Sequence, residues 1–451
     1  MCDQVDSIHS TSSISMAFFH NSTVNLLNLH YGIHSIALNG GAAFFAIYLL
    51  KSGVPVPAVF VSLALILLGR FVIRPIVIGF TARWGLRVMV VVGTVLSALQ
   101  YPLLAEIQGV GIALAGLIAV SAVGDTVYWT TYHAYFAALG DDHLRGQQIG
   151  VREAIAAVVG IASPLLTGWM LVAFGPRVAF GTTSVIAVLA ALPILWAPEV
   201  KVKPHVPGAF GAAVPGILLF VADGWVAAGY VFVWQIALFV SLGKSLLAYG
   251  GALAVAALVG AIGALTLGRH IDAGRGKQAV WYAFGMFALI VVLRAIATGD
   301  ATIAVLANTF GALAACLYIP TLMTAVYTLA KRSPCTLRFH VATEGGWDVG
   351  GATGLLAAAL ATGLAMPLSA SILLSLAGVA AIIIMLRRYY TNSPATATDV
   401  GGGTHHGLIH TWVRGGLRNF RRWVSNPKLP TEARLGRLGG KTESHRKLAN
   451  L

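Results

Sequence analysis

The sequence contains few charged residues and very few cysteines. Only 10% of its 451 residues are charged and 57% are hydrophobic, whereas roughly 25% are charged in an ordinary soluble domain. A soluble fold of this length could not bury so much apolar surface, so the composition excludes a soluble enzyme, a nucleic-acid-binding domain and a disordered chain. The cysteines are too few and too scattered for a disulfide framework or a zinc site; they are Cys2, Cys316 and Cys335.

Acidic residues are also scarce, and the basic residues gather near the C-terminus. From Arg387 onward the chain holds 12 of its 30 Lys and Arg residues and 3 of its 16 acidic residues. This tail therefore carries a net charge of +9, and the 386 residues before it carry only +5. Such a distribution indicates a basic tail on an apolar body, and we expect no nucleic-acid partner.

Long apolar stretches make up most of the chain. A helix needs about 20 apolar residues to cross roughly 30 Å of hydrocarbon, and these stretches are far longer than the roughly ten residues of a barrel strand. The twelve stretches of sufficient length lie near residues 27–50, 55–80, 87–106, 109–137, 148–173, 177–197, 212–240, 244–267, 277–297, 302–330, 340–364 and 367–388. The sequence thus predicts an all-α polytopic membrane protein with twelve transmembrane helices.

Lys and Arg are divided unevenly between alternate loops. If the N-terminus is cytoplasmic, the outer loops hold little more than Lys51, Arg177 and Lys244, while the inner loops and the tail hold most of the rest. Because basic residues favour the cytoplasmic side, we expect both termini to be cytoplasmic. We further expect an integral protein of the bacterial inner (plasma) membrane.

Spans, loops and composition together predict five segments. The tail contains apolar residues at helical spacing, which favours an amphipathic helix lying on the anionic lipids of the inner leaflet; a disordered basic tail is the alternative. The segments are a cytoplasmic N-terminal segment (1–26), an N-terminal six-helix bundle (27–197), a central cytoplasmic linker (198–211), a C-terminal six-helix bundle (212–388) and the basic cytoplasmic tail (389–451) with its amphipathic helix (408–424).

Two landmarks indicate that the chain is an internal repeat. Ala82 and Asp272 occupy matching places in the loops after spans 2 and 8, 190 residues apart. The pair Glu153 and Gly160 in span 5 recurs 191 residues later in span 11. Nearly equal offsets from independent landmarks favour two related halves of six spans each.

The loops after spans 2 and 8 resemble the signature of the major facilitator superfamily. Ala82 departs from the pattern, because the family usually has Asp at that place. The residues that carry the resemblance are Gly268, Asp272, Gly274 and Lys277, with an echo at Arg83, Gly85 and Arg87 and a Gly-Pro helix motif over 160–168. The resemblance implies two pseudo-symmetric six-helix bundles around a central cavity lined by spans 1, 4, 7 and 10. It also implies a monomer that works by alternating access.

Four charged residues inside the apolar spans are candidates for a gate. Arg70 and Arg74 share one face of span 2, and Glu344 and Asp348 share one face of span 11, because each pair is spaced i,i+4. The resemblance implies that these spans pack together, so we expect the arginines to meet the carboxylates when the gate closes. Pairing of the arginines within their own half, with Asp125 or Glu153, and direct substrate binding are the alternatives.

The resemblance implies a second gate contact. Asp272 follows span 8, and its family counterpart acts on the positive N-terminal end of a neighbouring helix. In this chain that end is the start of span 5, near Arg152.

Polar and aromatic residues concentrate on the spans that the resemblance assigns to the cavity. Buried carboxylates and histidines in membrane helices favour proton transfer or substrate binding. The aromatic residues could instead belong to the membrane interface or to helix packing. The candidates for substrate binding or proton coupling are His30, His34, Asp125, Tyr128, Trp129, His133, Asp223, Trp225 and Tyr230. For His30, the alternative interpretation is a position at the cytoplasmic membrane boundary. Arg294 in span 9 is expected to snorkel to the membrane surface or to attract an anion.

The leading functional hypothesis is a secondary active transporter that moves a small solute and is coupled to protons. The expected partners are a small-molecule substrate, protons and membrane lipids, and an anionic or an amphipathic solute fits equally well. No catalytic residue, metal or other cofactor is predicted, since the chain has no phosphate-binding loop and nothing brings its histidines and aspartates together as metal ligands. The alternatives are a non-transporting sensor or scaffold on the same fold and a membrane-embedded enzyme acting on lipid.

Overall fold

The computed structural model describes residues 22–139, 145–202, 207–271 and 276–392. Side chains are described throughout these ranges except at 137, 145–154, 264–271, 276–279, 337 and 391–392. The predicted amphipathic helix 408–424 lies outside the described residues.

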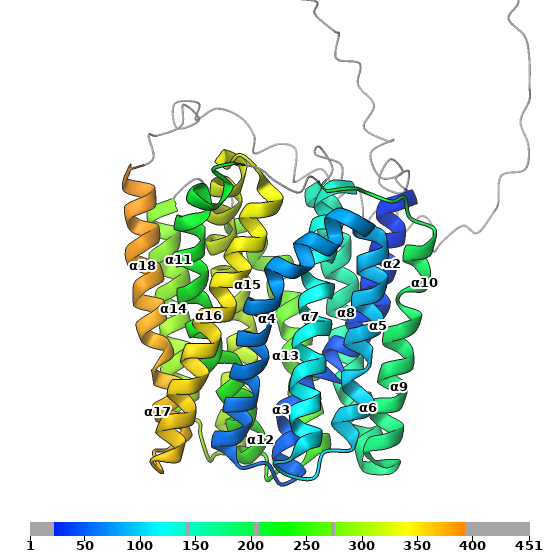
Figure 1. Cartoon of the computed structure of the whole chain (residues 1–451). Helices are drawn as coiled ribbons and strands as arrows, with labels where there is room; N and C mark the ends of the chain where they lie inside the picture. Colours follow the sequence, from blue (N-terminus) through cyan, green and yellow to red (C-terminus); the bar gives the residue numbers. More distant parts are fainter. Residues whose placement is uncertain (1–21, 140–144, 203–206, 272–275, 393–451) are drawn as a thin grey trace, which may run out of the picture. The chain divides into compact units, whose positions relative to one another are not determined.

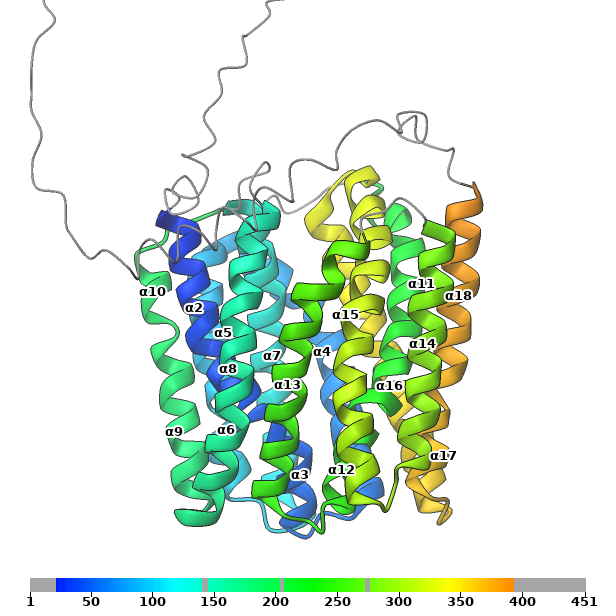
Figure 2. The same cartoon turned by 180° about the vertical axis from the view of Figure 1, so that it is seen from behind.

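The first half of the described chain consists of helices that run back and forth (Figures 1 and 2). Several spans are two consecutive helices separated by a short break. The elements are α2 (Ser22–Asn39), η2 (Ala42–Phe44), α3 (Phe45–Lys51), α4 (Val56–Trp84), α5 (Leu86–Ala98), α6 (Gln100–Ala105), α7 (Ile112–Leu139), α8 (Arg145–Ala173), α9 (Gly175–Leu189) and α10 (Leu192–Leu195).

The second half repeats this plan. Its first span contains one segment of π-helix, η3, in the middle. The elements are α11 (Ala209–Ala227), η3 (Ala228–Val233), α12 (Trp234–Ser241), α13 (Leu246–Ile271), α14 (Gly276–Ile296), α15 (Ala301–Arg332), α16 (Thr336–Gly363), α17 (Leu368–Leu373) and α18 (Ser375–Asn392).

The predicted fold class is confirmed: the described helices form twelve spans, six in each half. Ten of them are long and apolar enough, among the residues described, to cross a membrane. The other two are α14, whose apolar part is the shorter stretch Val280–Ile296, and α16, which carries charged residues along its first half. The first span begins at Ser22, five residues earlier than expected. The division into domains remains a prediction.

Small residues let the helices of each half approach closely, as is common between membrane helices. In the second half, α11 packs along α16. A Cβ on Gly224 would overlap the backbone of Trp347, and one on Gly350 would overlap the backbone of Val221. Because one side of α16 packs tightly against α11, its opposite side is turned toward other helices. Asp348 lies on that opposite side.

The two halves meet along two helix pairs. α4 of the first half packs against α16 of the second (Figure 1), and α8 packs against α13 (Figure 2). We call the α4–α16 contact the charged seam, after its arginines and carboxylates. We call the α8–α13 contact the glycine seam, after Gly168 and Gly250.

Candidate functional site

The charged seam brings together the four residues that the sequence placed on facing spans. Arg70 Nε lies 3.0 Å from Asp348 Oδ1. Arg74 donates to Glu344 Oε2 at 2.5 Å and also to Asp348. Each arginine of α4 therefore pairs with a carboxylate of α16 across the boundary between the halves. The expected contact is present, and its role as a gate remains a prediction.

These ion pairs are shielded from solvent. The Asp348 side chain is 0% exposed and the Arg74 side chain 4%. Arg74 also donates to the Thr130 hydroxyl of α7, at 3.1 Å. An ion pair in such an apolar setting is costly to break, because removing one partner leaves an uncompensated buried charge.

The cluster extends further into each half. In the first half, Gln100 donates to Asp125 at 3.4 Å, and Asp125 lies within electrostatic reach of Arg70. In the second half, the Arg70 guanidinium lies 6.0 Å from the ring of Trp347, which is within hydrogen-bonding reach of Asp223. Asp125 and Asp223 thus flank the same seam from opposite halves.

An exposed histidine adjoins the cluster on α7. His133 Nε2 lies 3.9 Å from Glu344 Oε1, and its side chain is 44% exposed. Its ring also stacks on Trp129, with 5.4 Å between the centroids. His133 therefore lies at the edge of the cluster, beside a carboxylate that is itself 19% exposed.

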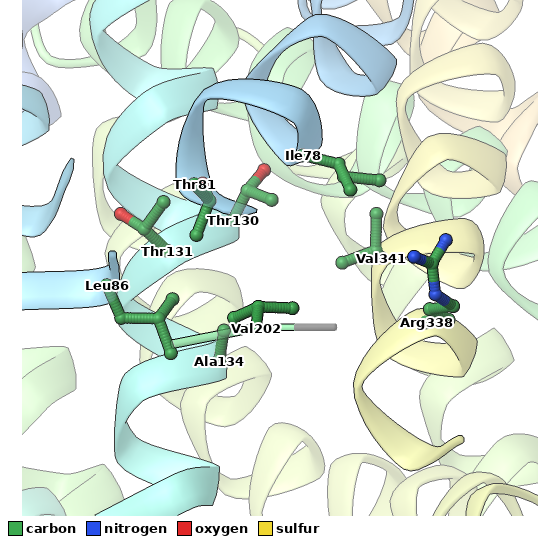
Figure 3. Close-up of a pocket in the computed structure, with 9 residues that line it drawn as sticks. All are labelled: Ile78, Thr81, Leu86, Thr130, Thr131, Ala134, Val202, Arg338 and Val341. Carbon is green, nitrogen blue, oxygen red and sulfur yellow. The ribbon is translucent and has the colours of Figure 1, made fainter. Parts of the chain in front are cut away.

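Beside this cluster is a small pocket between α4, α7 and α16. Figure 3 shows Arg338 and Val341 of α16 on one side and threonine side chains of α4 and α7 on the other. Val202, from the segment that follows α10, lies at its edge. The pocket is therefore bounded by both halves and by the linker between them.

The predicted histidine and aromatic residues of spans 1 and 4 form one buried cluster within the first half. His30 is 0% exposed, and its two ring nitrogens lie 2.6 Å from the Ala190 carbonyl oxygen and 3.1 Å from the Tyr128 hydroxyl. His34 packs on Tyr128 with 4.1 Å between ring centroids. His30 is therefore a buried, hydrogen-bonded residue inside the first half.

Trp225 and Tyr230 lie inside the second half. The Trp225 indole donates to the Leu374 carbonyl oxygen at 2.8 Å, and the Tyr230 hydroxyl donates to that of Gly311 at 2.8 Å. Both contacts join helices of the same half, which supports the packing alternative for these aromatic residues.

Arg294 is buried, so the prediction that it snorkels to the membrane surface is wrong. Its side chain is 5% exposed. The guanidinium carbon lies 3.8 Å from the centroid of the Tyr230 ring and 4.8 Å from that of the Trp234 ring, and Nη1 donates to the Tyr230 carbonyl oxygen at 2.5 Å. Tyr230 belongs to the π-helical segment η3. Aromatic faces and a backbone carbonyl group solvate this cation in place of water.

The glycine seam contrasts with the charged one. A Cβ on Gly250 of α13 would overlap the Pro164 carbonyl group of α8, and one on Gly168 would lie 2.7 Å from the Leu246 carbonyl oxygen. The described side chains along this seam, residues 155–173 and 246–263, include no charged group. The seam is held by close backbone packing.

A cavity of about 350 Å³ lies between the two halves beside the glycine seam. Its lining residues come from spans 1, 5, 7 and 8, and the expectation that spans 1, 4, 7 and 10 line a central cavity remains a prediction. The lining residues are Leu38, Asn39, Ala42, Ala43, Gly160, Pro164, Gln235, Leu253 and Ala257.

Two predicted gate residues remain outside this description. Asp272 lies outside the described residues, and Arg152 is in α8 but its side chain is not described. Their predicted contact is therefore untested.

Sequence reasoning missed Trp347, Asn39 and Gln235. Trp347 precedes Asp348 directly, and Gln235 is an amide in an otherwise apolar span. A lone polar residue in such a span was the available signal, but only the packing shows which of these residues face the boundary between the halves.

Comparisons with known proteins agree with this architecture. The sequence model of the Major Facilitator Superfamily matches residues 29–334. No curated protein sequence matches the chain. Two solved structures share the fold at low sequence identity. The human organic anion transporter MFSD10 (TETRAN) aligns with a TM-score of 0.60 at 13% identity, covering 81% of this chain and 99% of that chain. The POT family transporter PepTSo aligns with a TM-score of 0.61 at 11% identity, covering 82% of this chain and 99% of that chain.

The family match covers well over half of the chain, and the twelve-span fold with its two related halves is the fold of these solved structures. This chain therefore belongs to the Major Facilitator Superfamily, a superfamily of membrane transporters.

Proposed function

We propose that this protein is a proton-coupled secondary active transporter that moves a small solute by alternating access. In such a mechanism the two halves rock around a central site and expose it to one side of the membrane at a time. Contacts between the halves must therefore form and break in every cycle.

The observation that carries this proposal is the set of ion pairs on the charged seam. Both cations lie on α4 and both anions lie on α16. Separating them in an apolar setting would leave uncompensated charges, which costs several kcal/mol. Binding of a proton to a carboxylate removes its negative charge and so lowers the cost of opening the seam.

The composition of the cluster supports protons as the coupling ion. Three carboxyl groups, those of Asp125, Glu344 and Asp348, lie near two guanidinium groups, those of Arg70 and Arg74. One carboxyl group therefore lacks a matching arginine, and a proton can neutralise it. We propose that His133, which is half-exposed and lies beside Glu344, passes protons to and from the cluster.

The test measures the opening of the charged seam as a function of pH. Spin labels are attached through Trp84→Cys at the end of α4 and Lys331→Cys at the end of α15, both exposed, in a chain whose three natural cysteines are replaced by serine. We expect the distance distribution to shift to longer values at pH 5 relative to pH 8. Glu344→Gln with Asp348→Asn, which mimics full protonation, should give the longer distances at both pH values.

A matched control uses an ion pair away from the seam. Arg177 donates to Glu106 at 2.7 and 2.8 Å in an exposed setting, and these hydrogen bonds hold the pKa of the Glu106 carboxyl below its ordinary value. Glu106 therefore stays ionised between pH 5 and pH 8, and Glu106→Gln should leave the pH response unchanged. Identical distance distributions at both pH values in the unmodified seam would overturn proton coupling.

Flux separates a transporter from the alternatives of a sensor, scaffold or lipid-acting enzyme. Proteoliposomes with an internal pH indicator are exposed to a panel of solutes under an imposed pH gradient. A transporter moves protons together with one solute, and a scaffold binds without flux, whereas an enzyme changes its substrate.

Location and lipid contacts also stay proposals. We propose the bacterial inner membrane, cytoplasmic termini and binding of the basic tail to anionic lipids from the distribution of Lys and Arg in the sequence, and a monomeric state from the family resemblance.

A further inference from the structure

The cavity between the halves has a distinctive chemical lining. Its nine described lining residues include two carboxamides, Asn39 and Gln235, and the other seven are apolar or glycine. None of the nine is charged. A space of about 350 Å³ is at the lower end of the usual range for small-molecule sites.

The two carboxamides come from opposite halves and have hydrogen-bonding capacity to spare. The Asn39 amide donates to the Ser35 carbonyl oxygen at 2.9 Å, which leaves its own Oδ1 as an acceptor. A Cβ placed on Gly160, another lining residue, would lie 3.4 Å from that oxygen. Gln235 makes no side-chain hydrogen bond among those of the described residues, and it is half-buried. A ligand could therefore donate to Asn39 and both donate to and accept from Gln235.

Five charged side chains of the described spans are engaged elsewhere. Arg70, Arg74, Glu344 and Asp348 pair with one another on the charged seam. Arg294 is enclosed by Tyr230 and Trp234 inside the second half. A charged solute in this cavity would meet no opposite charge from the lining residues, and burying an unpaired ion is costly.

Contacts between the halves lie beside the cavity. The Tyr249 hydroxyl of α13 donates to the Ala43 carbonyl oxygen at 3.2 Å, and the Tyr249 ring lies edge-on to Phe44 at 5.3 Å between centroids. Ala43 is itself a lining residue, and Leu253, one helical turn after Tyr249, is another. A bound solute would thus rest directly against a contact that alternating access must open.

We infer that the cavity binds an uncharged, hydrogen-bonding solute, held between the Gln235 carboxamide and the Asn39 carbonyl oxygen. This inference rests on the proposed function, because it names the class of solute carried at the central site. It departs from the activity of the human organic anion transporter MFSD10, since none of the described lining residues is cationic.

The test measures which reagents reach the cavity. Gln235→Cys is made in the full-length chain with the three natural cysteines replaced by serine. It is then labelled with three methanethiosulfonates of similar size: a neutral hydroxyethyl, an anionic sulfonatoethyl and a cationic trimethylammonioethyl reagent. Gln108→Cys, at an exposed glutamine outside the spans, serves as the matched control and corrects for intrinsic reactivity.

After this correction, the neutral reagent should label position 235 at least about tenfold faster than either charged reagent, because both charges would be desolvated without a partner. Labelling by the anionic reagent as fast as by the neutral one would overturn the inference and favour an anionic solute. Equal labelling by the cationic reagent would overturn it in favour of a cation.

The outcome does not depend on transport. Charge-selective labelling without flux in proteoliposomes would refute the proposed function and leave the assignment of a neutral site intact. Flux together with unselective labelling would refute only the solute class.

Discussion

The charged seam and the glycine seam join the same two halves by different physical means. On the charged seam, Arg74 bridges to Glu344 and Asp348 across the boundary. On the glycine seam, the backbones of α8 and α13 approach at Gly168 and Gly250 with no charged side chain in the described stretch. Ion pairs respond to protonation, whereas close packing responds to side-chain volume. The difference suggests that pH acts on one seam and that shape governs the other.

The internal repeat makes this difference visible in the sequence. With the offset of 190 residues, Arg70 and Arg74 of α4 correspond to Gly260 and Ala264 of α13. The two halves therefore carry equivalent helices at both seams, but among the described side chains only the charged seam has cations. A pseudo-symmetric fold can in this way hold two unequal gates.

The largest expected effect is on the charged seam. Arg74→Gln should lower the free energy of unfolding by about 3–5 kcal/mol, because it leaves Glu344 without its partner and Asp348 with only Arg70. Adding Glu344→Gln should recover part of this loss, with a coupling energy of about 0.5–3 kcal/mol. The measurement is a double-mutant cycle of unfolding in detergent micelles.

If the effects of the two substitutions on the free energy of unfolding were strictly additive, Arg74 and Glu344 would not interact, which would contradict the ion pair. Neutral variants are preferable to reversing Arg74 and Asp348 alone. The reversed residues would face Glu344 and Arg70 with like charges, so a loss of activity there would have two causes.

A smaller effect is expected when the glycine seam is widened. Gly250→Ala should destabilise the protein by about 1–3 kcal/mol, because its Cβ would overlap the Pro164 carbonyl group. Gly251→Ala is the matched control, since a Cβ there meets no atom within 4 Å and alanine favours helix by about 1 kcal/mol. Thermal unfolding of the two variants checks this, and equal behaviour would show that the seam is not closely packed in solution.

The smallest effect is expected for the Tyr249 hydrogen bond that joins the two halves beside the cavity. Tyr249→Phe removes the hydroxyl that donates to Ala43 and should cost about 0.5–1.5 kcal/mol. Tyr282→Phe, at a side chain that is 76% exposed, should change stability by less than about 0.5 kcal/mol. The unfolding midpoints of the two variants are compared. A Tyr249 variant as stable as the Tyr282 variant would show that this hydrogen bond does not stabilise the protein.

The contact between the four charged residues was predictable because its signals are local. The i,i+4 spacing of Arg70 and Arg74, and of Glu344 and Asp348, sets each pair on one helical face, and an apolar span makes a partner necessary. The resemblance to a known family supplied the pairing of spans 2 and 11. The structure added the neighbours Thr130, Trp347 and His133, which lie on other helices.

The cavity was not predictable in the same way. Residues such as Tyr128 and Tyr230 have the polarity expected of a binding site, yet they pack within their own halves. Asn39 and Gln235, which line the cavity, are single amides with no helical pattern. Lining residues depend on how helices rotate against one another, and the hydrophobic period of a membrane helix says little about rotation because lipid and protein interior are similarly apolar.

The sequence by itself determined the membrane location, the twelve spans and the twofold plan, because apolar length and repeated spacing are properties of the chain. Only the tertiary structure decided that Arg294 is buried between aromatic rings and that the described residues lining the cavity beside the glycine seam are uncharged. A charge in a span has to find a partner, but which groups solvate it depends on the close packing of several helices, which no single segment encodes.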